Sequence, residues 1–267
     1  CGMVGTVEID DGRGLSVADQ TTPDGAVFAG QLATMVTSGC KACAVEVSSH
    51  ALDQGRVDGT VFAGAVFSNL TRDHLDYHKT MEAYRDAKAR LFALVKPDGF
   101  VALNADDPAS AHYRGVAKRR IIEYGFAATD GVTVEDVELS LDGSLARFRF
   151  GTEAARIRFP LIGRHNLSNA MAAVSACIGC GVPFARATAA LESFGVVPGR
   201  LERVANARGL AVFVDYAHTD DAMRNVLGIL KSLARRRLSI VFGCGGDRDR
   251  GKRPLMARAA EELADRI

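Results

Sequence analysis

Short apolar runs alternate with amphipathic runs along the first half of the chain, and this alternation constrains the fold more than any other feature. The apolar runs have the length of buried strands, and the amphipathic runs repeat apolar residues at the 3.6-residue period of a helix. The expected strands are residues 3–9, 42–47, 63–69, 100–104 and 121–124, and the expected helices are residues 26–37, 81–95 and 108–116. This order predicts an α/β fold with a central, mostly parallel sheet flanked by helices.

The pattern then changes to one that favours antiparallel structure. Residues 132–159 alternate short β-prone runs around Asp142-Gly143, which predicts a small antiparallel region built from hairpins. Two helices are expected to follow, at residues 167–178 and 184–194.

A linker at residues 197–200 separates these helices from a second expected α/β unit. Its predicted strands are residues 211–215 and 238–242, and its predicted helices are residues 220–233 and 254–264. We therefore place a domain boundary near Pro198, between residues 1–197 and residues 198–267.

Composition and charge exclude some classes of protein. The 267 residues are 48% hydrophobic and 24% charged, as is typical of a globular protein. The net charge of +1 supplies no bulk attraction to nucleic acid, and we expect no such partner. No apolar run approaches the roughly 20 residues that span a bilayer, so we expect no membrane insertion.

The cysteines allow two interpretations. Cys40/Cys43 and Cys177/Cys180 have the C-x-x-C spacing of zinc ribbons. However, Cys43 begins an expected strand, and the second pair lies in an Ala-rich helical run. We therefore expect buried thiols in a protein of the reducing cytoplasm.

One lysine lies on the apolar face of an expected helix. The apolar side chains of residues 81–95 form one stripe at the helical period: Met81, Tyr84, Leu91, Phe92 and Val95. Lys88 falls on this stripe, and a buried lysine must be neutral, paired or chemically altered. The alternative is a buried stem whose ammonium reaches solvent. The acid- and His-rich segment at residues 71–78 favours a polar site instead.

Polar residues also follow the strand expected at residues 42–47, at the sheet edge where open α/β proteins bind ligands. The carboxylate of Glu46 suits magnesium, which prefers oxygen ligands. Ser48, Gln54 and Arg56 come just after it and are suited to gripping an anionic substrate. Alternatively, Ser48 is a turn residue and Glu46 is an edge carboxylate without a ligand.

Asp73, His74, Asp76 and His78 follow the next strand and should emerge at the same edge. Two histidines four residues apart fit a zinc pair, but no further soft ligand accompanies them. A magnesium or phosphate role fits this group better. The alternative is a helix cap with incidental histidines.

Residues 246–252 fit the pattern G-x-x-x-x-G-K between an expected strand and helix, the context of a phosphate-binding loop. Arg253 stands where such a loop needs a Ser or Thr hydroxyl for magnesium. The loop is therefore either a tight turn with solvated charges or a contact to phosphate from the side.

Two further motifs allow more than one interpretation. Asn166 suits a helix N-cap, and the amides of Asn166 and Asn169 also suit a purine edge. Asp215 and His218 end a strand of the second unit and should face a ligand cleft.

These segments together resemble the Mur ligases of bacterial cell-wall synthesis, and among them the MurE type. The matching segments occur in the family's order: Thr21-Thr22-Pro23-Asp24, residues 46–52, Gln54-x-Arg56-Val57, residues 69–78, Ala87-Lys88, residues 163–166, Asn169-Ala170, and residues 198–204, 215–219 and 243–254. The resemblance implies a P-loop ATPase-like central domain followed by a partial Rossmann-like C-terminal domain.

The resemblance also implies an ATP-dependent, ADP-forming ligase that uses Mg²⁺. In such enzymes ATP phosphorylates the free carboxylate of UDP-N-acetylmuramoyl-L-alanyl-D-glutamate. The amine of a diamino acid, meso-diaminopimelate or L-lysine, then attacks the acyl phosphate to give an amide. The implied partners are this UDP-linked dipeptide and the diamino acid, and we expect a cytoplasmic monomer.

Residue roles follow from the same resemblance. Glu46, His74 and Lys88 match the catalytic metal site, in which family members carbamylate the lysine. Positions matching those that hold the UDP-linked substrate are Thr21, Thr22, Ser48, Gln54 and Arg56. Positions matching ATP contacts are Asn166, Asn169, Arg200 and Asp215.

The sequence also departs from the family's pattern. It shows no Walker-A loop ahead of Gly5, no nucleotide-sugar-binding domain before that, and no C-terminal segment that selects the amino acid. We therefore expect a fragment that is inactive by itself. Asp220 also replaces a usual proline.

Several alternatives remain beside the MurE type. They are a ligase of the MurF, folylpolyglutamate or cyanophycin synthetase type, a non-catalytic relative without a P-loop, and a nucleotide switch that uses residues 246–252.

Overall fold

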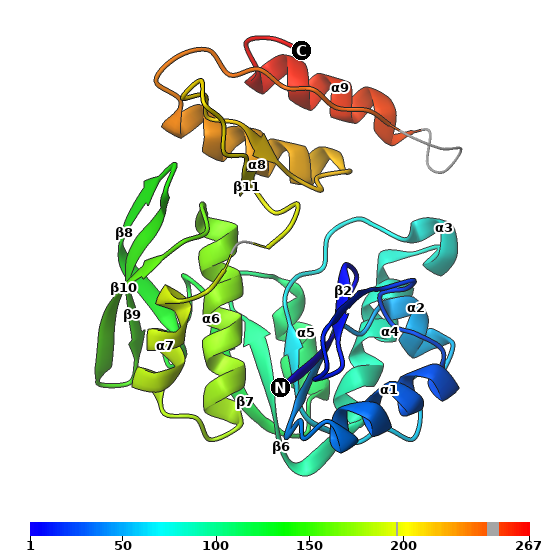
Figure 1. Ribbon diagram of the computed structural model, residues 1–267. Coiled ribbons are helices and arrows are strands. Elements are labelled where there is room, and N and C mark those ends of the chain that lie inside the picture. Colours follow the sequence, from blue (N-terminus) through cyan, green and yellow to red (C-terminus); the bar gives the residue numbers. More distant parts are fainter. Residues whose placement is uncertain (196, 245–250) are drawn as a thin grey trace. The chain divides into compact units, whose positions relative to one another are not determined.

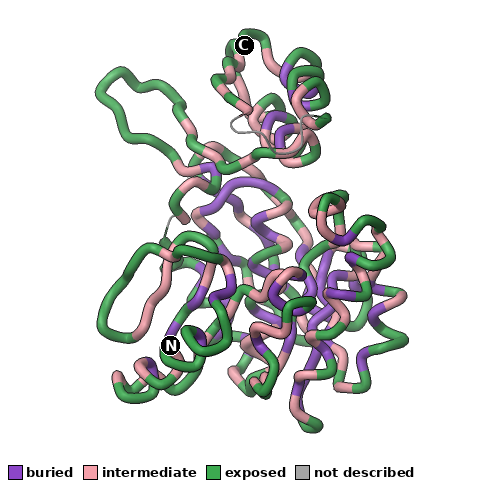
Figure 2. The backbone as a smooth tube through the Cα atoms, turned by 90° about the vertical axis from the view of Figure 1, so that its right-hand side faces the viewer, coloured by how far each residue is buried: buried purple, intermediate pink, exposed green. Residues whose placement is uncertain are grey.

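The computed structural model describes residues 1–195, 197–244 and 251–267 (Figure 1). Its contacts divide the chain into two compact units, Cys1–Glu123 and Tyr124–Ile267. Both units mix helices with strands, and the predicted α/β class is confirmed. The backbone tube in Figure 2 shows buried segments along the interior elements and exposed segments in the connecting loops.

A four-stranded sheet begins the first unit, in the order β3-β2-β1-β4. β1 (Gly2–Val4) pairs in parallel with β4 (Cys43–Val45), and α1 (Gly25–Thr37) lies between them in the sequence. Apolar side chains from these elements form one core cluster, which includes Val4, Phe28 and Met35.

The prediction of a single strand over residues 3–9 is wrong. The chain turns after β1 and returns as β2 (Glu8–Asp10), which pairs with β1 antiparallel. β3 (Leu15–Val17), which was not expected, continues this meander. The apolar residues Met3, Val4, Val7 and Ile9 suggest one strand, but the backbone N–H of Gly5 donates to the carbonyl of Glu8 at 3.1 Å and closes a turn.

A second sheet in this unit has the order β5-β6-β7. β5 (Phe62–Phe67) and β6 (Val95–Asn104) are parallel, joined through α4 (Met81–Ala93), and β7 (Arg120–Tyr124) follows α5 (Ala109–Val116). The parallel pairings are therefore divided between two sheets. The core cluster beneath this sheet contains β-strand residues such as Val101 and Leu103 with Phe92 and Tyr113 from the helices.

Two short helices, neither of them expected, shape the loops after β4 and β5. Ser48 caps α2 (Ser49–Asp53), its hydroxyl accepting the N–H of Ala51 at 3.2 Å. α3 (Leu75–His78) begins after His74, whose φ of 56° lies in the left-handed region. Both helices contact α4.

In the second unit, β8 (Thr133–Ser140), β9 (Gly143–Phe150) and β10 (Glu153–Phe159) form an antiparallel sheet, which confirms the hairpin prediction. α6 (Arg164–Gly179) and α7 (Phe184–Glu192) follow. Gly163 occupies the N-cap of α6, so the prediction of Asn166 as an N-cap is wrong.

The last part of the chain contains β11 (Glu202–Arg203), β12 (Phe213–Val214), α8 (Asp220–Leu233) and α9 (Lys252–Leu263). The two helices bury Met223, Leu227 and Met256 in a shared cluster. The prediction of a strand at residues 238–242 is wrong. That segment forms a single isolated parallel bridge, between Ser239 and Arg266.

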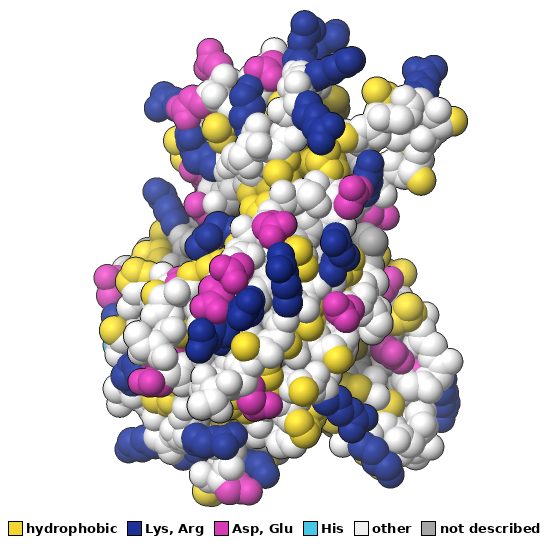
Figure 3. Space-filling view, turned by 90° about the vertical axis from the view of Figure 1, so that its left-hand side faces the viewer, with side chains coloured by type: hydrophobic (Ala, Val, Ile, Leu, Met, Phe, Trp, Pro, Cys, Tyr) yellow, Lys and Arg dark blue, Asp and Glu magenta, His cyan; other side chains and the backbone are white. Residues whose placement is uncertain are grey.

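Lys/Arg and Asp/Glu side chains are interspersed over the face drawn in Figure 3. All six cysteines are free, and each is exposed or half-buried, so the prediction of buried thiols is wrong as to burial. No helix in the described ranges has both the length and the apolar character needed to cross a membrane.

Candidate active site

Glu46 follows β4, and the parallel register of β1 and β4 places it beside the turn that follows β1. Two groups of Thr6 in that turn donate to its carboxylate. The backbone N–H and the hydroxyl of Thr6 reach Oε2 of Glu46 at 3.0 and 2.6 Å. The side chain of Glu46 is therefore oriented by a residue from the neighbouring strand end.

Thr22 holds the backbone of the same segment. Its hydroxyl donates to the carbonyl of Glu46 at 2.7 Å and accepts the N–H of Ser48 at 3.0 Å. Thr22 is only 1% exposed, so its hydroxyl is committed to this bridge. Within this structure Thr22 supports the loop, while the adjacent Thr21 hydroxyl lies 3.0 Å from that of Thr6.

Arg56 is fixed at the rim of this site by several acceptors. Its guanidinium donates to the side chain of Gln54 at 2.9 Å and to the carbonyl of Thr22 at 3.0 Å. The guanidinium also pairs with Asp24 at 3.4 Å. The predicted substrate residues Thr21, Thr22, Ser48, Gln54 and Arg56 therefore form one connected group.

Lys88 lies on the inner face of α4, as its position on the apolar stripe predicts. Burial lowers the pKa of its ammonium, while the charges of Glu46, Asp73 and Asp107 oppose that shift. Its Nζ lies 5.1 Å from the centroid of the Tyr84 ring. The structure thus favours the polar site over an ammonium that reaches solvent.

An imidazole and phenol cluster adjoins the lysine. The ring of His50 lies 4.8 Å from that of His74 and 5.4 Å from that of His78. His74 and His78 both contact the Tyr84 ring, at 5.8 and 5.3 Å between centroids. Because Lys88 contacts the same ring, His74 and Lys88 belong to one neighbourhood.

The ionisation of this cluster follows from its burial. Burial, then the neighbouring imidazoles, lower the pKa of His50 and His78. Burial and the charge of Asp73 raise the pKa of Tyr84 to about 12. His78 also makes a 2.9 Å hydrogen bond to the hydroxyl of Ser49, so it is engaged within the protein.

The donor set near Lys88 fits magnesium better than zinc. In the described ranges, no group of three or more His, Cys, Asp or Glu side chains is arranged to hold a metal ion. Magnesium needs few protein ligands, because it keeps waters and binds substrate phosphates. The Glu46 carboxylate suits such a site, and Lys88 would add an oxygen ligand if it is carbamylated, whereas the His74 imidazole, a nitrogen donor, would be the less favoured ligand.

The predicted ATP contacts lie in the second unit. Asn166 is buried and donates to the carbonyl of Ile162 at 2.9 Å, whereas Asn169 is exposed. Asp215 accepts the backbone N–H groups of Leu201 and Ala217, each at 2.8 Å. Asp215 therefore shapes the loop around it.

Arg200 is exposed, and its guanidinium carbon lies 5.8 Å from the centroid of the Tyr216 ring. His218 is exposed as well, and its ring lies 5.2 Å from that of Tyr216. The G-x-x-x-x-G-K prediction falls largely outside the described residues, which resume at residue 251.

Sequence reasoning missed three groups at this site. Thr6 was assigned to a strand interior, although Gly5-Thr6 directly follows the apolar pair Met3-Val4. Tyr84 was treated only as an apolar stripe residue. Asp107 follows β6, so the rule that ligand groups follow parallel strands was sufficient to find it.

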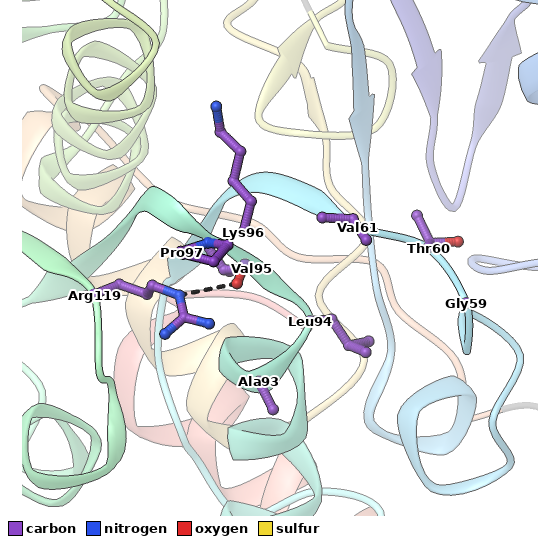
Figure 4. Close-up of a pocket in the computed structure, with 9 residues that line it drawn as sticks. All are labelled: Gly59, Thr60, Val61, Ala93, Leu94, Val95, Lys96, Pro97 and Arg119. Atoms are coloured by element: carbon purple, nitrogen blue, oxygen red, sulfur yellow. Dashed lines mark hydrogen bonds between the residues drawn. The ribbon is translucent and has the colours of Figure 1, made fainter.

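A cavity of about 290 Å³ lies elsewhere, at the amino ends of β5 and β6 (Figure 4). Val61, Lys96 and Arg119 are among its lining residues, and Arg119 donates to the carbonyl of Val95 at 2.9 Å. The polar groups described above follow the carboxyl ends of strands instead. We therefore do not assign the chemistry to this cavity.

Comparison with known proteins decides the family. Residues 1–177 match the Mur ligase middle domain, and residues 199–267 match the glutamate ligase domain of Mur ligases. The chain belongs to the Mur ligase family. The parallel sheets with their helices belong to its middle domain, and α8 and α9 belong to its Rossmann-like C-terminal domain.

Curated relatives of this Mur ligase chain are named UDP-N-acetylmuramoyl-L-alanyl-D-glutamate--2,6-diaminopimelate ligase. The protein of Geobacter sulfurreducens is 48% identical over 263 residues, which cover 96% of this chain and 51% of the relative. That of Synechococcus elongatus is 44% identical, covering 94% and 51%. The chain spans about half the length of the curated relatives it matches.

Solved structures agree with this family. A structure titled as the same diaminopimelate ligase superposes with a TM-score of 0.74 at 35% identity, over 100% of this chain and 55% of its own. The MurF ligase of Thermotoga maritima in complex with ADP has a TM-score of 0.69 at 16% identity, covering 91% and 58%. At that identity the second match shows the shared fold alone.

Proposed function

We propose that the full-length protein is an ATP-dependent, ADP-forming ligase that adds 2,6-diaminopimelate to UDP-N-acetylmuramoyl-L-alanyl-D-glutamate. The names of relatives up to 48% identical support this substrate pair. One observation of the structure carries the chemistry: half-buried Lys88 lies within the field of three carboxylates, those of Glu46, Asp73 and Asp107. A lysine that only packs its stem against the core would not require carboxylates around its ammonium.

The proposed reaction has two steps that balance. The free carboxylate of the D-glutamyl residue attacks the γ-phosphorus of ATP, forming an acyl phosphate and releasing ADP. The neutral amine of diaminopimelate then attacks the acyl carbon, the amide bond forms as the nitrogen loses one proton, and the bond to phosphate breaks so that phosphate leaves. Bound magnesium would offset charge on the transferring phosphoryl group, with Glu46, His74 and carbamylated Lys88 holding it.

The environment of Lys88 supports its carbamylation. A neutral amine adds CO₂ and loses one proton to give a carbamate, and burial lowers the pKa of this ammonium. A carbamate supplies the hard oxygen that magnesium prefers. Thr21, Ser48, Gln54 and Arg56 would hold the UDP-linked substrate, and Thr22 would keep their loop in place.

The second unit would supply the ATP contacts, with Asn169 and Asn166 towards the adenine and with Arg200 and Asp215 towards the rest of the nucleotide. We further propose a domain boundary near Pro198, which the separate family matches to residues 1–177 and 199–267 support, together with a monomeric state and a cytoplasmic location.

A direct test incubates the purified full-length protein with ATP, Mg²⁺, the UDP-linked dipeptide and one amine acceptor. Phosphate release and the product mass should depend on diaminopimelate and not on L-lysine. Turnover with D-alanyl-D-alanine would favour the MurF alternative, and turnover with glutamate on a folate would favour the folylpolyglutamate type. Nucleotide binding without turnover on any acceptor would favour the non-catalytic relative.

Lys252 separates this proposal from a nucleotide switch. Lys252→Ala in the full-length protein should weaken turnover while ATP still binds, as measured by calorimetry. Loss of ATP binding in that variant would instead support residues 246–252 as the main nucleotide site.

A further inference from the structure

The hydroxyl of Thr6 lies between two predicted sites that belong to different ligands. On one side it contacts Oε2 of Glu46 at 2.6 Å, and on the other it contacts the hydroxyl of Thr21 at 3.0 Å. Glu46 is proposed to hold magnesium, and Thr21 is proposed to hold the UDP-linked substrate. Thr6 therefore joins the two sites.

The direction of these hydrogen bonds follows from the inventory of donors. An ionised carboxylate only accepts, so Thr6 must donate its single hydroxyl hydrogen to Glu46. The contact with Thr21 then requires Thr21 to donate and Thr6 to accept. Thr21 has thereby used its own hydrogen, and its oxygen presents lone pairs to any ligand. The ligand group at Thr21 should therefore be a donor, such as an amide N–H or a sugar hydroxyl.

The backbone of Thr6 strengthens the same arrangement. Its N–H also donates to Oε2 of Glu46, at 3.0 Å, so both donors of Thr6 reach one oxygen. These two bonds leave Oε1 for another partner and orient the plane of the carboxylate. Hydrogen bonds to a charged acceptor are short and strong, so this orientation is well defined.

The neighbouring threonine holds Glu46 by a second route. Thr22 bridges the carbonyl of Glu46 and the N–H of Ser48. Thr21 reaches the side chain of Glu46 through Thr6, and Thr22 contacts the backbone of Glu46 directly. Displacement of Thr21 by a ligand would therefore be transmitted to the Glu46 carboxylate through Thr6.

We propose that Thr6 is a positioning residue that couples the substrate subsite at Thr21 to the orientation of the metal-binding carboxylate of Glu46. This inference rests on the proposed function for the identity of the two ligands. Its geometric part, a hydroxyl relay from Thr21 through Thr6 to Glu46, stands on the described contacts.

The test uses the full-length protein and measures Mn²⁺ binding by electron paramagnetic resonance, with Mn²⁺ alone and with the UDP-linked dipeptide. Thr6→Val removes the hydroxyl at similar volume and keeps the backbone donor. It should weaken Mn²⁺ binding about tenfold, the expected effect of losing a hydrogen bond to a charged group. Thr6→Ser keeps the relay and should bind Mn²⁺ as the wild type does.

Thr37→Val is the matched control, because Thr37 is exposed and its hydroxyl bonds only to the nearby carbonyl of Thr34 in α1. Thermal unfolding of each variant, with restoration by Thr6→Ser, separates a local effect from misfolding.

Coupling is measured by a cycle of Thr6→Val, Thr21→Val and the double variant. The dipeptide should change the Mn²⁺ affinity of the wild type but not that of Thr6→Val, and the two single changes should be non-additive. Equal Mn²⁺ affinity in wild type and Thr6→Val, or additive effects in the cycle, would overturn the inference.

The experiments distinguish failure of the proposed ligase function from failure of the hydroxyl relay. If the wild type shows no turnover, but its Mn²⁺ binding is lost in Glu46→Gln and weakened in Thr6→Val, then the ligase proposal fails and the relay stands. If the wild type turns over and Thr6→Val matches it in Mn²⁺ binding and its response to the dipeptide, the relay alone is wrong.

Discussion

Thr22→Val should destabilise the protein, because it removes a buried hydroxyl that bridges two backbone groups of the part-buried segment after β4. Thr22 is 1% exposed, and its hydroxyl pairs with the carbonyl of Glu46 at 2.7 Å and with the N–H of Ser48 at 3.0 Å. Valine has the same shape, so the substitution leaves no cavity. The effect therefore comes from two unpaired polar groups.

The expected loss in the free energy of unfolding follows from the cost of leaving these backbone groups without partners. Each buried donor or acceptor left unpaired lowers the free energy of unfolding by about 1–3 kcal/mol. Glu46 is exposed and Ser48 is half-buried, so water can replace part of the lost hydrogen bonding, and we expect a loss of about 1–2 kcal/mol. At roughly 2–4 °C per kcal/mol for domains of this size, the melting temperature should fall by about 5 °C.

Urea titration and thermal unfolding of the full-length protein measure this effect. Thr22→Ser retains the hydroxyl and should lose only about 1 kcal/mol, for one buried methyl group. Thr37→Val makes the same chemical change on the surface and should stay within about 0.5 kcal/mol of the wild type. The bridge would be refuted by a Thr22→Val variant as stable as Thr37→Val.

Two further predictions concern Lys88 and His78. Lys88→Ala should abolish turnover of the full-length enzyme, and added formate or acetate should restore part of it by replacing the carbamate oxygens. Full turnover of the plain variant would exclude a role for the carbamate. Burial lowers the pKa of His78 below its usual 6.5, so the unfolded chain binds a proton that the folded chain resists. The free energy of unfolding should therefore decrease as pH falls below 6.5, towards the folded-state pKa. In urea titrations across that range, His78→Gln should reduce the slope of the unfolding free energy against pH by up to one proton. The slope should not vanish, because burial lowers the pKa of His50 and His165 as well. An unchanged slope would show that His78 titrates alike in both states.

The fold class and most elements could be predicted, because they depend on local periodicity. α1, α4, α5 and α8 lie close to their expected positions. The errors fall where the chain must turn back. The β1–β2 turn is set by a backbone hydrogen bond between Gly5 and Glu8 that apolar patterning does not reveal.

The candidate site could be predicted only in part. Glu46, His74 and Lys88 are predicted as site residues because they follow strands or break an apolar stripe, and their metal role is what the resemblance implies. Thr6 was missed because its importance depends on the turn that was read as a strand. Thr22 was found by resemblance, but its commitment to two backbone partners is a property of packing.

The sequence by itself determined that strands alternate with helices, that certain carboxylates and imidazoles follow the strands, and that one lysine lies on an apolar face. Those facts are periodic or local, and neighbouring residues suffice to encode them. Only the tertiary structure decided which groups meet. Glu46, Asp73 and Asp107 act on Lys88 from distant parts of the chain. The register of β1 against β4 brings Thr6 to one particular oxygen of Glu46, since pairing between strands is fixed by contacts that no local pattern records.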